Sequence, residues 1–225
     1  MKPLLRFFFR LLYHQFAWTY DLVAAAVSFN RWKDWVLSVI PFIEGRRVLE
    51  IGYGPGHLQR ALRSRGLTAM GVDESPQMGR LARRNLRRGL QPRNAIHASA
   101  EAPVAYTQFN LTRGLAQALP FQAESFDTIV ATFPTEYFAD PETLREVKRC
   151  LVPGGRFLVL PVALPKNSLL DWLFKTTHQR PAEALDVIRA KLEKPFALGG
   201  FQTEIKTLEI SSGILVIVIA IKPSP

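Results

Sequence analysis

Apolar positions recur along the chain with two different spacings, and the two kinds of segment alternate. Short runs of apolar or β-branched residues at 48–51, 68–72 and 109–113 are typical of buried strands. Helical spacing occurs between them, at about 56–64 and 76–90. Strands that alternate with helices predict a mostly parallel sheet. After residue 200 the pattern changes, because residues 203–210 and 213–222 flank a Ser-Ser-Gly turn, which predicts a closing β-hairpin.

Two amphipathic helices are expected before this core. Residues 29–42 have tryptophan and aliphatic side chains at helical spacing and end near Pro41. Residues 2–23 carry four basic or histidine side chains at four-residue spacing among phenylalanine, leucine and other apolar residues: Lys2, Arg6, Arg10 and His14. A basic stripe on an apolar helix suits a membrane interface. The same charges argue against a spanning helix and a signal peptide, and a lid over the protein's own pocket remains the alternative.

Length and cysteine content bound the domain organisation. A chain of 225 residues is long enough for one large α/β domain. We therefore expect N-terminal helices over residues 1–45 and one cofactor-binding domain over residues 46–225. The single cysteine, Cys150, excludes an internal disulfide and suits a reducing compartment. Four scattered histidines predict no metal site.

The excess of positive over negative charge is confined to the first 100 residues of the chain. The net charge is +10, and residues 1–100 hold 16 Lys or Arg against 6 Asp or Glu, whereas residues 101–225 hold 13 of each kind. Such asymmetry favours an anionic surface as partner, either lipid or nucleic acid. The expected helix at 76–90 places five arginines on one arc, where an ordinary solvated face is the alternative: Arg80, Arg83, Arg84, Arg87 and Arg88. No aromatic residues are interleaved with them, so nucleic acid is the less favoured partner.

The segment Val48–Leu58 is the strongest candidate for chemistry. An apolar strand interrupted by Glu50 leads into three glycines, which let the backbone turn sharply and approach a ligand. A dinucleotide fingerprint would place the third glycine at position 57, where this chain has His57. The spacing is therefore G-x-G-x-G, which disfavours a NAD-linked oxidoreductase. Asp73 ends the next expected strand, where a carboxylate can accept hydrogen bonds from ribose hydroxyls; helix capping is the alternative, although Ser75 can take that role.

These motifs together resemble one enzyme family. The glycine spacing is similar to motif I of the class I S-adenosylmethionine-dependent methyltransferases. The tripeptides LPF, SFD and TFP, at residues 119–121, 125–127 and 132–134, resemble the corresponding segments of the methyltransferases of ubiquinone and menaquinone biosynthesis. Residues 140–160 resemble their next helix, Pro-Gly-Gly turn and fifth strand, and residues 20–32 resemble the helices that precede motif I. The resemblance covers roughly residues 16–161 in pieces.

The resemblance implies a fold and a cofactor. The fold is a Rossmann-like, doubly wound and mostly parallel seven-stranded sheet with an antiparallel last strand, preceded by N-terminal helices. The cofactor is S-adenosylmethionine, with these residues expected around it: Glu50, Gly52, Gly54, Asp73, Leu115, Ala116 and Thr132. One departure concerns Leu115, because the family usually has an acidic residue there that binds the adenine amino group. Backbone groups, Gln117 or packing would then have to hold the adenine.

The acceptor side is less well defined by the sequence. Glu136 and Tyr137 follow the fourth strand, so either could orient or deprotonate an acceptor hydroxyl, although Tyr137 could also only pack over the pocket mouth. His57 and His178 are weaker candidates. The apolar and basic entry region, with the helical segment at 165–195, favours a small or lipid-like acceptor such as a quinol or a phospholipid headgroup. We expect a cytoplasmic protein, peripheral at the inner face of the membrane; a non-catalytic interaction protein is the alternative that Leu115 keeps open.

Overall fold

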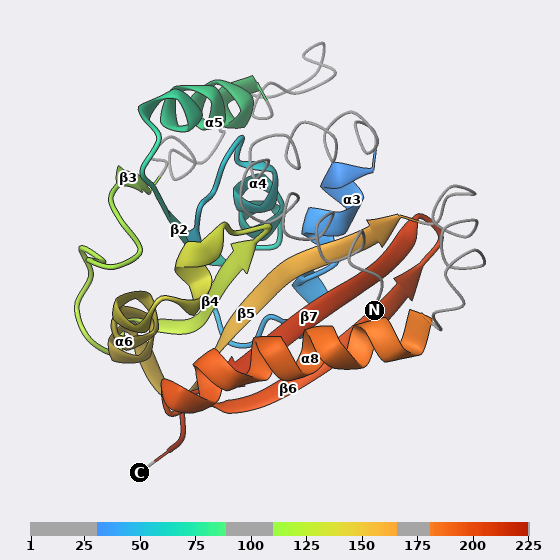
Figure 1. Cartoon of the computed structure of the whole chain (residues 1–225). Coiled ribbons are helices and arrows are strands. Elements are labelled where there is room, and N and C mark those ends of the chain that lie inside the picture. The colour runs from blue at the N-terminus through green and yellow to red at the C-terminus, as the bar shows by residue number, and fades with distance from the viewer. Residues whose placement is uncertain (1–30, 89–109, 166–180, 225) are drawn as a thin grey trace. The chain divides into compact units, whose positions relative to one another are not determined.

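The computed structural model describes residues 31–88, 110–165 and 181–224 of the chain (Figure 1). The chain divides into two compact units, residues 1–35 and 36–225. The helix expected at residues 2–23, the loop at 91–108 and His178 lie outside the described residues. The predicted domain boundary at residue 45 stays a prediction.

The second unit is built on a seven-stranded sheet whose strands have the order β3-β2-β1-β4-β5-β7-β6. Its strands are β1 (Arg47–Ile51), β2 (Thr68–Asp73), β3 (Leu111–Arg113), β4 (Phe126–Thr132), β5 (Leu151–Pro165), β6 (Gln202–Ile210) and β7 (Gly213–Ile221). The helices are α3 (Trp32–Leu37), α4 (His57–Ser64), α5 (Pro76–Arg88), α6 (Pro141–Cys150) and α8 (Pro181–Leu198), with 3-10 turns η1 (Ile40–Phe42) and η3 (Glu136–Ala139).

Strand directions confirm the predicted fold class. The strands β1 to β5 run parallel to their neighbours, and β7 runs antiparallel to both β5 and β6. The strand β1 lies between β2 and β4, so the strands that follow it in the sequence are added first on one side of β1 and then on the other. In a doubly wound sheet, the point where the side of addition changes lies beside a crevice at the carboxyl ends of the strands, where ligands bind. The expected glycine loop leaves β1 at that edge.

One part of the core lies between one face of the sheet and the helices α6 and α8. Leu49, Ile129 and Phe157 point to this face and pack with buried side chains of the two helices. Figure 1 shows α8 lying across β6 and β7. Phe196 of α8 is fully buried, and its ring lies 6.0 Å from that of Phe157. Because side chains alternate along a strand, Glu50 points to the opposite face, toward α4.

One carboxylate fixes the start of β1 against β4. Asp127 Oδ2 accepts the backbone amides of Arg46 (2.8 Å) and Arg47 (2.9 Å), and its Oδ1 accepts the Arg47 guanidinium. The guanidinium beside it holds the pKa of Asp127 near 2, below the ordinary 3.8. Gly45 turns immediately before this contact with a φ of +73°. A Cβ on Gly45 would lie 2.2 Å from Cβ of Asp127, so a glycine is required here.

The predicted LPF segment is held in place by α6. Glu146 Oε2 accepts the amide of Leu119 at 2.9 Å. The guanidinium of Arg149 donates to the carbonyls of Leu119 (3.0 Å) and Phe121 (2.7 Å), and it also pairs with Glu146. The connection from β3 to β4 is therefore anchored on both sides of Pro120.

Two predicted boundaries differ from the structure. The Pro-Gly-Gly segment, expected as a turn, lies within β5: Leu151 pairs with Phe126 and Arg156 with Thr128, so extra residues bulge out around Gly154, which has a φ of +74°. The helical segment expected to end near residue 195 continues through Pro195 to Leu198. Among the described residues, no helix is long and apolar enough to cross a membrane.

Candidate functional site

The loop after β1 turns the chain through three glycines into α4. Gly52, Gly54 and Gly56 have φ values of +72°, +48° and +81°, which residues with a side chain rarely adopt. The amide of Gly52 donates to the carbonyl of Val72 at 2.7 Å, so the loop begins by extending the pairing of β1 with β2. Gly56 is the N-cap of α4 and offers no side-chain cap. A helix N-terminus without a side-chain cap is suited to bind a polar or anionic group of a ligand.

Asp73 connects this loop to the end of β2. Its Oδ2 accepts the amide of Gly54 and its Oδ1 accepts the amide of Ser75, each at 2.9 Å. Ser75 Oγ in turn accepts the amide of Met78 and caps α5 as predicted. The carboxylate is thus less free than the sequence indicated. A carboxylate has about four lone-pair sites, however, so two remain for a ligand.

Glu50 lies buried beneath the loop with one oxygen unused. Its side chain is 2% exposed, and among the described residues Oε2 has no hydrogen-bond partner. The pKa of Glu50 is raised to about 8: burial is the largest cause and the negative charge of Asp73 adds to it, while hydrogen bonds from Gln59 act in the opposite direction. A buried acid without a partner is costly. Its position beside the glycine loop fits a ligand that brings a cationic group.

The predicted acceptor-side residues differ in their surroundings. Glu136 is exposed at the start of η3, whereas the Tyr137 hydroxyl donates to the carbonyl of Ile51 at 3.3 Å. A Cβ on Gly52 would lie only 2.7 Å from that hydroxyl. Burial raises the pKa of Tyr137 well above its ordinary value, and the charges of Asp73 and Glu50 add to the shift. Tyr137 therefore keeps its proton and acts as a donor at neutral pH.

A cavity of about 690 Å³ lies between the ends of β2 and β3. It is lined by Glu74, Ser75, Gln77, Arg113, Gly114 and Leu115. Leu115 is 52% exposed at its rim, whereas the neighbouring Ala116 is buried in the core. Arg113 Nε donates to the carbonyl of Glu74 at 3.0 Å. The sequence reasoning missed Glu74, Gln77 and Arg113, although their places beside two strand ends could have indicated them.

The structure thus brings most of the predicted residues to one edge of the sheet. Glu50, Asp73 and Tyr137 act electrostatically on one another around the glycine loop. Thr132 ends β4 at the same edge and is followed by Phe133, whose φ of +50° is unusual for a bulky residue. His57 is the first residue of α4. Within the described residues there is no group of three His, Cys, Asp or Glu side chains that could hold a metal.

A second cavity is remote from these residues. It measures about 780 Å³ and lies between α6 and the end of α8, where Leu144, Lys148 and Leu198 are among its lining residues. None of the predicted site residues lines it. The chemistry is therefore expected at the glycine loop and the smaller cavity.

A glycine loop, a buried acid and an acidic strand end at the switch point of a doubly wound sheet define a nucleotide-type cofactor site. Residues 49–159 match the family described as "Methyltransferase domain". The demethylmenaquinone methyltransferase of Thermus thermophilus is 30% identical over 176 residues, which are 75% of this chain and 72% of the relative. The ubiquinone/menaquinone biosynthesis C-methyltransferase UbiE of Blochmanniella floridana is 28% identical over 171 residues, 72% of this chain and 61% of the relative.

A solved structure shares the fold. Phosphoethanolamine N-methyltransferase 2 of Haemonchus contortus, in complex with phosphomonomethylethanolamine and S-adenosylhomocysteine, superposes with a TM-score of 0.59 at 15% identity. The match covers 95% of this chain and 60% of that one. The chain belongs to the S-adenosylmethionine-dependent methyltransferases of the methyltransferase-domain family. Its cofactor is S-adenosylmethionine, and the Glu50 Oε2 atom, which has no hydrogen-bond partner among the described residues, fits the ammonium group of that molecule.

Proposed function

We propose that this methyltransferase acts on a small, apolar or membrane-associated acceptor, with a quinol-like ring favoured over a phospholipid headgroup. The observation that carries the cofactor site is the buried Oε2 atom of Glu50 beside the glycine loop, which has no hydrogen-bond partner among the described residues. The quinol-like acceptor is supported by the demethylmenaquinone methyltransferase at 30% identity. The phospholipid headgroup has no comparable support in sequence, so it remains the second acceptor to test.

The cofactor would be held by residues that the structure gathers at the loop. Glu50 would pair with the ammonium group, Asp73 would accept the ribose hydroxyls, and Gly52 and Gly54 would allow close backbone approach. Leu115 and Ala116 would line the adenine side and Thr132 the methionine side. The bound cofactor supplies a methyl group already activated by a sulfonium charge. The chain mainly has to exclude water and align the acceptor, effects worth up to roughly 7 to 11 kcal/mol in well-oriented systems.

Adenine recognition would differ from the pattern that the sequence resembles. Leu115 replaces the usual acid, so a side-chain hydrogen bond worth about 0.5 to 1.5 kcal/mol is missing. Backbone groups, Gln117 and packing were the expected substitutes, and the cavity lining adds two polar side chains to them, Glu74 and Gln77. Either side chain could accept from the adenine amino group. We therefore infer that Leu115 contributes packing and that Glu74 or Gln77 contributes polarity.

On the acceptor side we assign different roles to the two predicted residues. Tyr137 keeps its proton and donates a hydrogen bond to the carbonyl of Ile51 at the end of β1, which leaves the hydroxyl oxygen to accept a hydrogen bond from an acceptor hydroxyl and orient it. Glu136 is exposed and therefore remains the candidate for deprotonation. The segment of residues 1–18 would deliver an apolar acceptor from the inner face of the membrane, with the protein otherwise in the cytoplasm.

The second candidate function is a non-catalytic interaction protein with the methyltransferase fold. One observation favours it, namely the apolar Leu115 at the rim where the family resemblance leads one to expect an acid. This alternative predicts no measurable binding of S-adenosylmethionine. Catalysis instead predicts binding that depends on Asp73.

The test is calorimetry followed by methyl transfer. S-adenosylmethionine and S-adenosylhomocysteine are titrated into the full chain and into Asp73→Ala, which should bind roughly ten-fold or more weakly because charge-assisted bonds worth about 1.5 to 3 kcal/mol are lost. Asp127→Asn is the matched control, since this carboxylate binds backbone amides at the opposite end of β1. Labelled methyl transfer to a demethylated prenyl quinol and to phosphatidylethanolamine then separates the acceptors. Equal affinity in a folded Asp73→Ala chain would refute the site.

A further inference from the structure

The helix α5 is strongly basic and is attached to the core by a narrow strip. Its 13 residues contain five arginines and no acidic residue, and only Ala82 and Leu86 are buried. These two pack with Tyr53 and Leu111 in a small cluster separate from the main core. Arg83 donates to the carbonyl of Leu111 at 2.9 Å. Among the described residues, none of the five arginines forms an ion pair with a carboxylate.

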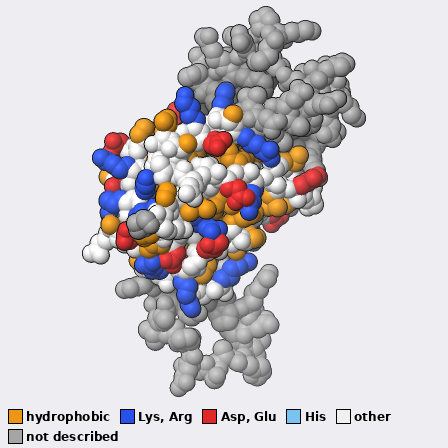
Figure 2. All heavy atoms as spheres, turned by 90° about the horizontal axis from the view of Figure 1, so that it is seen from below, with side chains coloured by type: hydrophobic (Ala, Val, Ile, Leu, Met, Phe, Trp, Pro, Cys, Tyr) orange, Lys and Arg blue, Asp and Glu red, His pale blue; other side chains and the backbone are white. Residues whose placement is uncertain are grey.

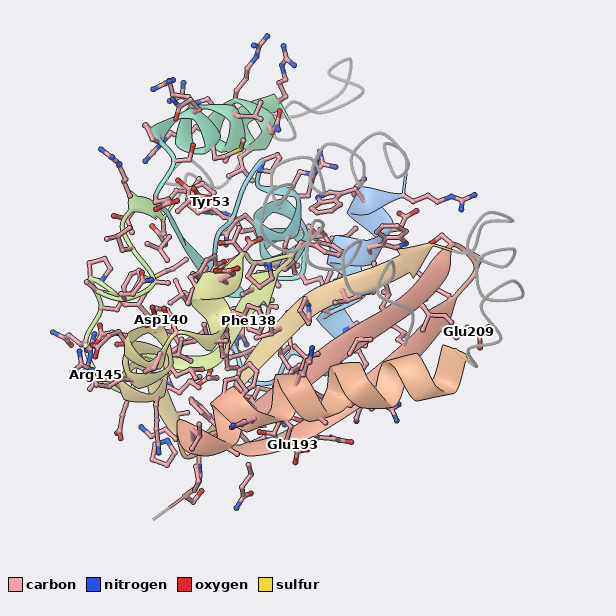
Figure 3. The ribbon with its side chains drawn as sticks, in the orientation of Figure 1. Tyr53, Phe138, Asp140, Arg145, Glu193 and Glu209 are labelled. Atoms are coloured by element: carbon pink, nitrogen blue, oxygen red, sulfur yellow. The ribbon has the colours of Figure 1, made fainter. Side chains whose placement is uncertain are left out.

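The arginines face away from the core. At 100° per residue, the positions opposite to the buried strip are occupied by four arginines: Arg80, Arg84, Arg87 and Arg88. Figure 3 shows long side chains tipped with nitrogen that radiate from the outer side of α5. The charge is not balanced locally, because residues 57–88 contain eight arginines against Asp73 and Glu74. Asp73 is buried, so it compensates little of this charge at the surface.

Exposed apolar side chains lie among these charges. Four large hydrophobic residues are exposed in the described part of the chain, and three of them belong to this end of the molecule: Met78 (36%), Leu81 (39%) and Leu115 (52%). Leu115 shares the lining of the 690 Å³ cavity with Gln77, which is the second residue of α5. Figure 2 shows the side away from α5, where acidic and basic side chains are interspersed instead. The exposed apolar side chains and the arginines of α5 thus lie at the same end of the molecule as this cavity, whose lining also includes Glu74.

We propose that the outer face of α5, together with Met78, Leu81 and Leu115, docks on an anionic lipid membrane. We call this surface the α5 face. Arginine suits it because the planar guanidinium binds phosphate through two parallel hydrogen bonds. The apolar side chains then enter the headgroup region of the membrane. Binding a soluble anion would bury none of them, so these side chains favour a membrane as the partner. Docking here brings the cavity mouth to the lipid surface and does not depend on which acceptor is methylated.

Nucleic acid is the less favoured occupant of the same charge. Single-stranded binding surfaces combine cations with aromatic side chains on which bases stack. The helix α5 contains no aromatic residue, and the exposed side chains next to its arginines are aliphatic or thioether groups. Each arginine near an anionic surface strengthens binding by about five-fold at low salt, so the four outward arginines supply a strong but salt-sensitive attraction.

The test compares three full-length chains in vesicle sedimentation. The first is the wild type, and the second is Arg80→Gln/Arg84→Gln/Arg88→Gln. The matched control is Arg145→Gln/Lys191→Gln/Lys194→Gln, which removes the same number of positive charges from exposed positions of α6 and α8, one of them paired with Glu142. Vesicles of phosphatidylcholine are used with and without phosphatidylglycerol, at low and high salt. All three chains keep residues 1–30, so any contribution of that segment is common to them.

The α5 variant should bind anionic vesicles on the order of a hundred-fold more weakly than the wild type, whereas the control should differ little. Leu81→Gln should weaken the binding that persists at high salt. Equal binding by both triple variants would overturn the proposal. A wild-type chain that does not sediment with anionic vesicles would also overturn it. Binding of single-stranded RNA without binding of vesicles would assign the α5 face to nucleic acid and would also overturn it.

Discussion

Replacing Glu50 by glutamine should stabilise the cofactor-free protein at neutral pH. Burial raises the pKa of Glu50 from 4.5 to about 8. As the pH rises above 4.5, the unfolded chain releases this proton while the folded chain retains it, so folding stability falls until the pH passes about 8. This shift of the Glu50 pKa lowers the free energy of unfolding by about 5 kcal/mol over the whole pH interval and by about 3 kcal/mol at pH 7. Glutamine has nearly the shape of the neutral acid and cannot ionise.

The assay is urea unfolding of the wild type and Glu50→Gln at several pH values. We expect the two stabilities to be similar near pH 4.5 and the variant to gain progressively up to about pH 8. S-adenosylhomocysteine should reverse the order, because the wild type gains an ion pair that the variant lacks. The cofactor's ammonium group should also release the Glu50 proton, which calorimetry in buffers of different ionisation enthalpy detects. A stability difference that does not change with pH would refute the reasoning.

Four further outcomes are expected. Gly45→Ala should destabilise the fold by about 3 kcal/mol or more, since the φ of +73° and the contact with Asp127 both oppose a Cβ; thermal unfolding measures it, and an unchanged midpoint would contradict it. Asp127→Asn should lower folding stability by about 1 kcal/mol above pH 4 and not at all below pH 2, because the pKa of Asp127 is lower in the folded chain than in the unfolded one. A loss of stability that persists below pH 2 would contradict a stabilising role of the ionised carboxylate. Tyr137→Phe should lower turnover while cofactor affinity changes less than about two-fold; full turnover in both this variant and Glu136→Gln would exclude a role for either hydroxyl or carboxylate. A truncated chain beginning at Ala17 should sediment less with anionic vesicles than the full chain, and equal sedimentation would leave residues 1–16 as a pocket lid only.

The sequence predicted the sheet and the cofactor edge because their signals are local. Apolar runs that end in Glu50-Ile51-Gly52 or in Asp73 place a strand and its functional end together. Loop glycines with positive φ were likewise readable, since few other residues adopt that conformation. These features depend on backbone conformation and alternation, which short windows of sequence record.

What the sequence could not predict depends on contacts between distant segments. Pro195 should end a helix, yet α8 continues because Phe196 is fully buried against the rings of Phe138 and Phe157. The amide of Ser75 lies two positions from Asp73, but the amide of Gly54 comes from 19 positions away and reaches the carboxylate only once β1 and β2 have paired. The carboxyl of Glu50 and the hydroxyl of Tyr137 are 87 positions apart in the sequence, and they approach the glycine loop together only once β1 and β4 have paired.

The hydrogen bonds of Asp127 with Arg46 and Arg47 have a consequence for the order in which the chain folds. The two residues Arg47 and Asp127 are 80 positions apart. The central strands β1 and β4 can therefore pair only after β2, α5 and β3, which lie between them in the sequence, have been synthesised. Loop-closure entropy grows only as the logarithm of length, and doubling a loop costs about 0.6 kcal/mol. A few residues added to or removed from 89–109, within this closed stretch, would therefore change folding stability little.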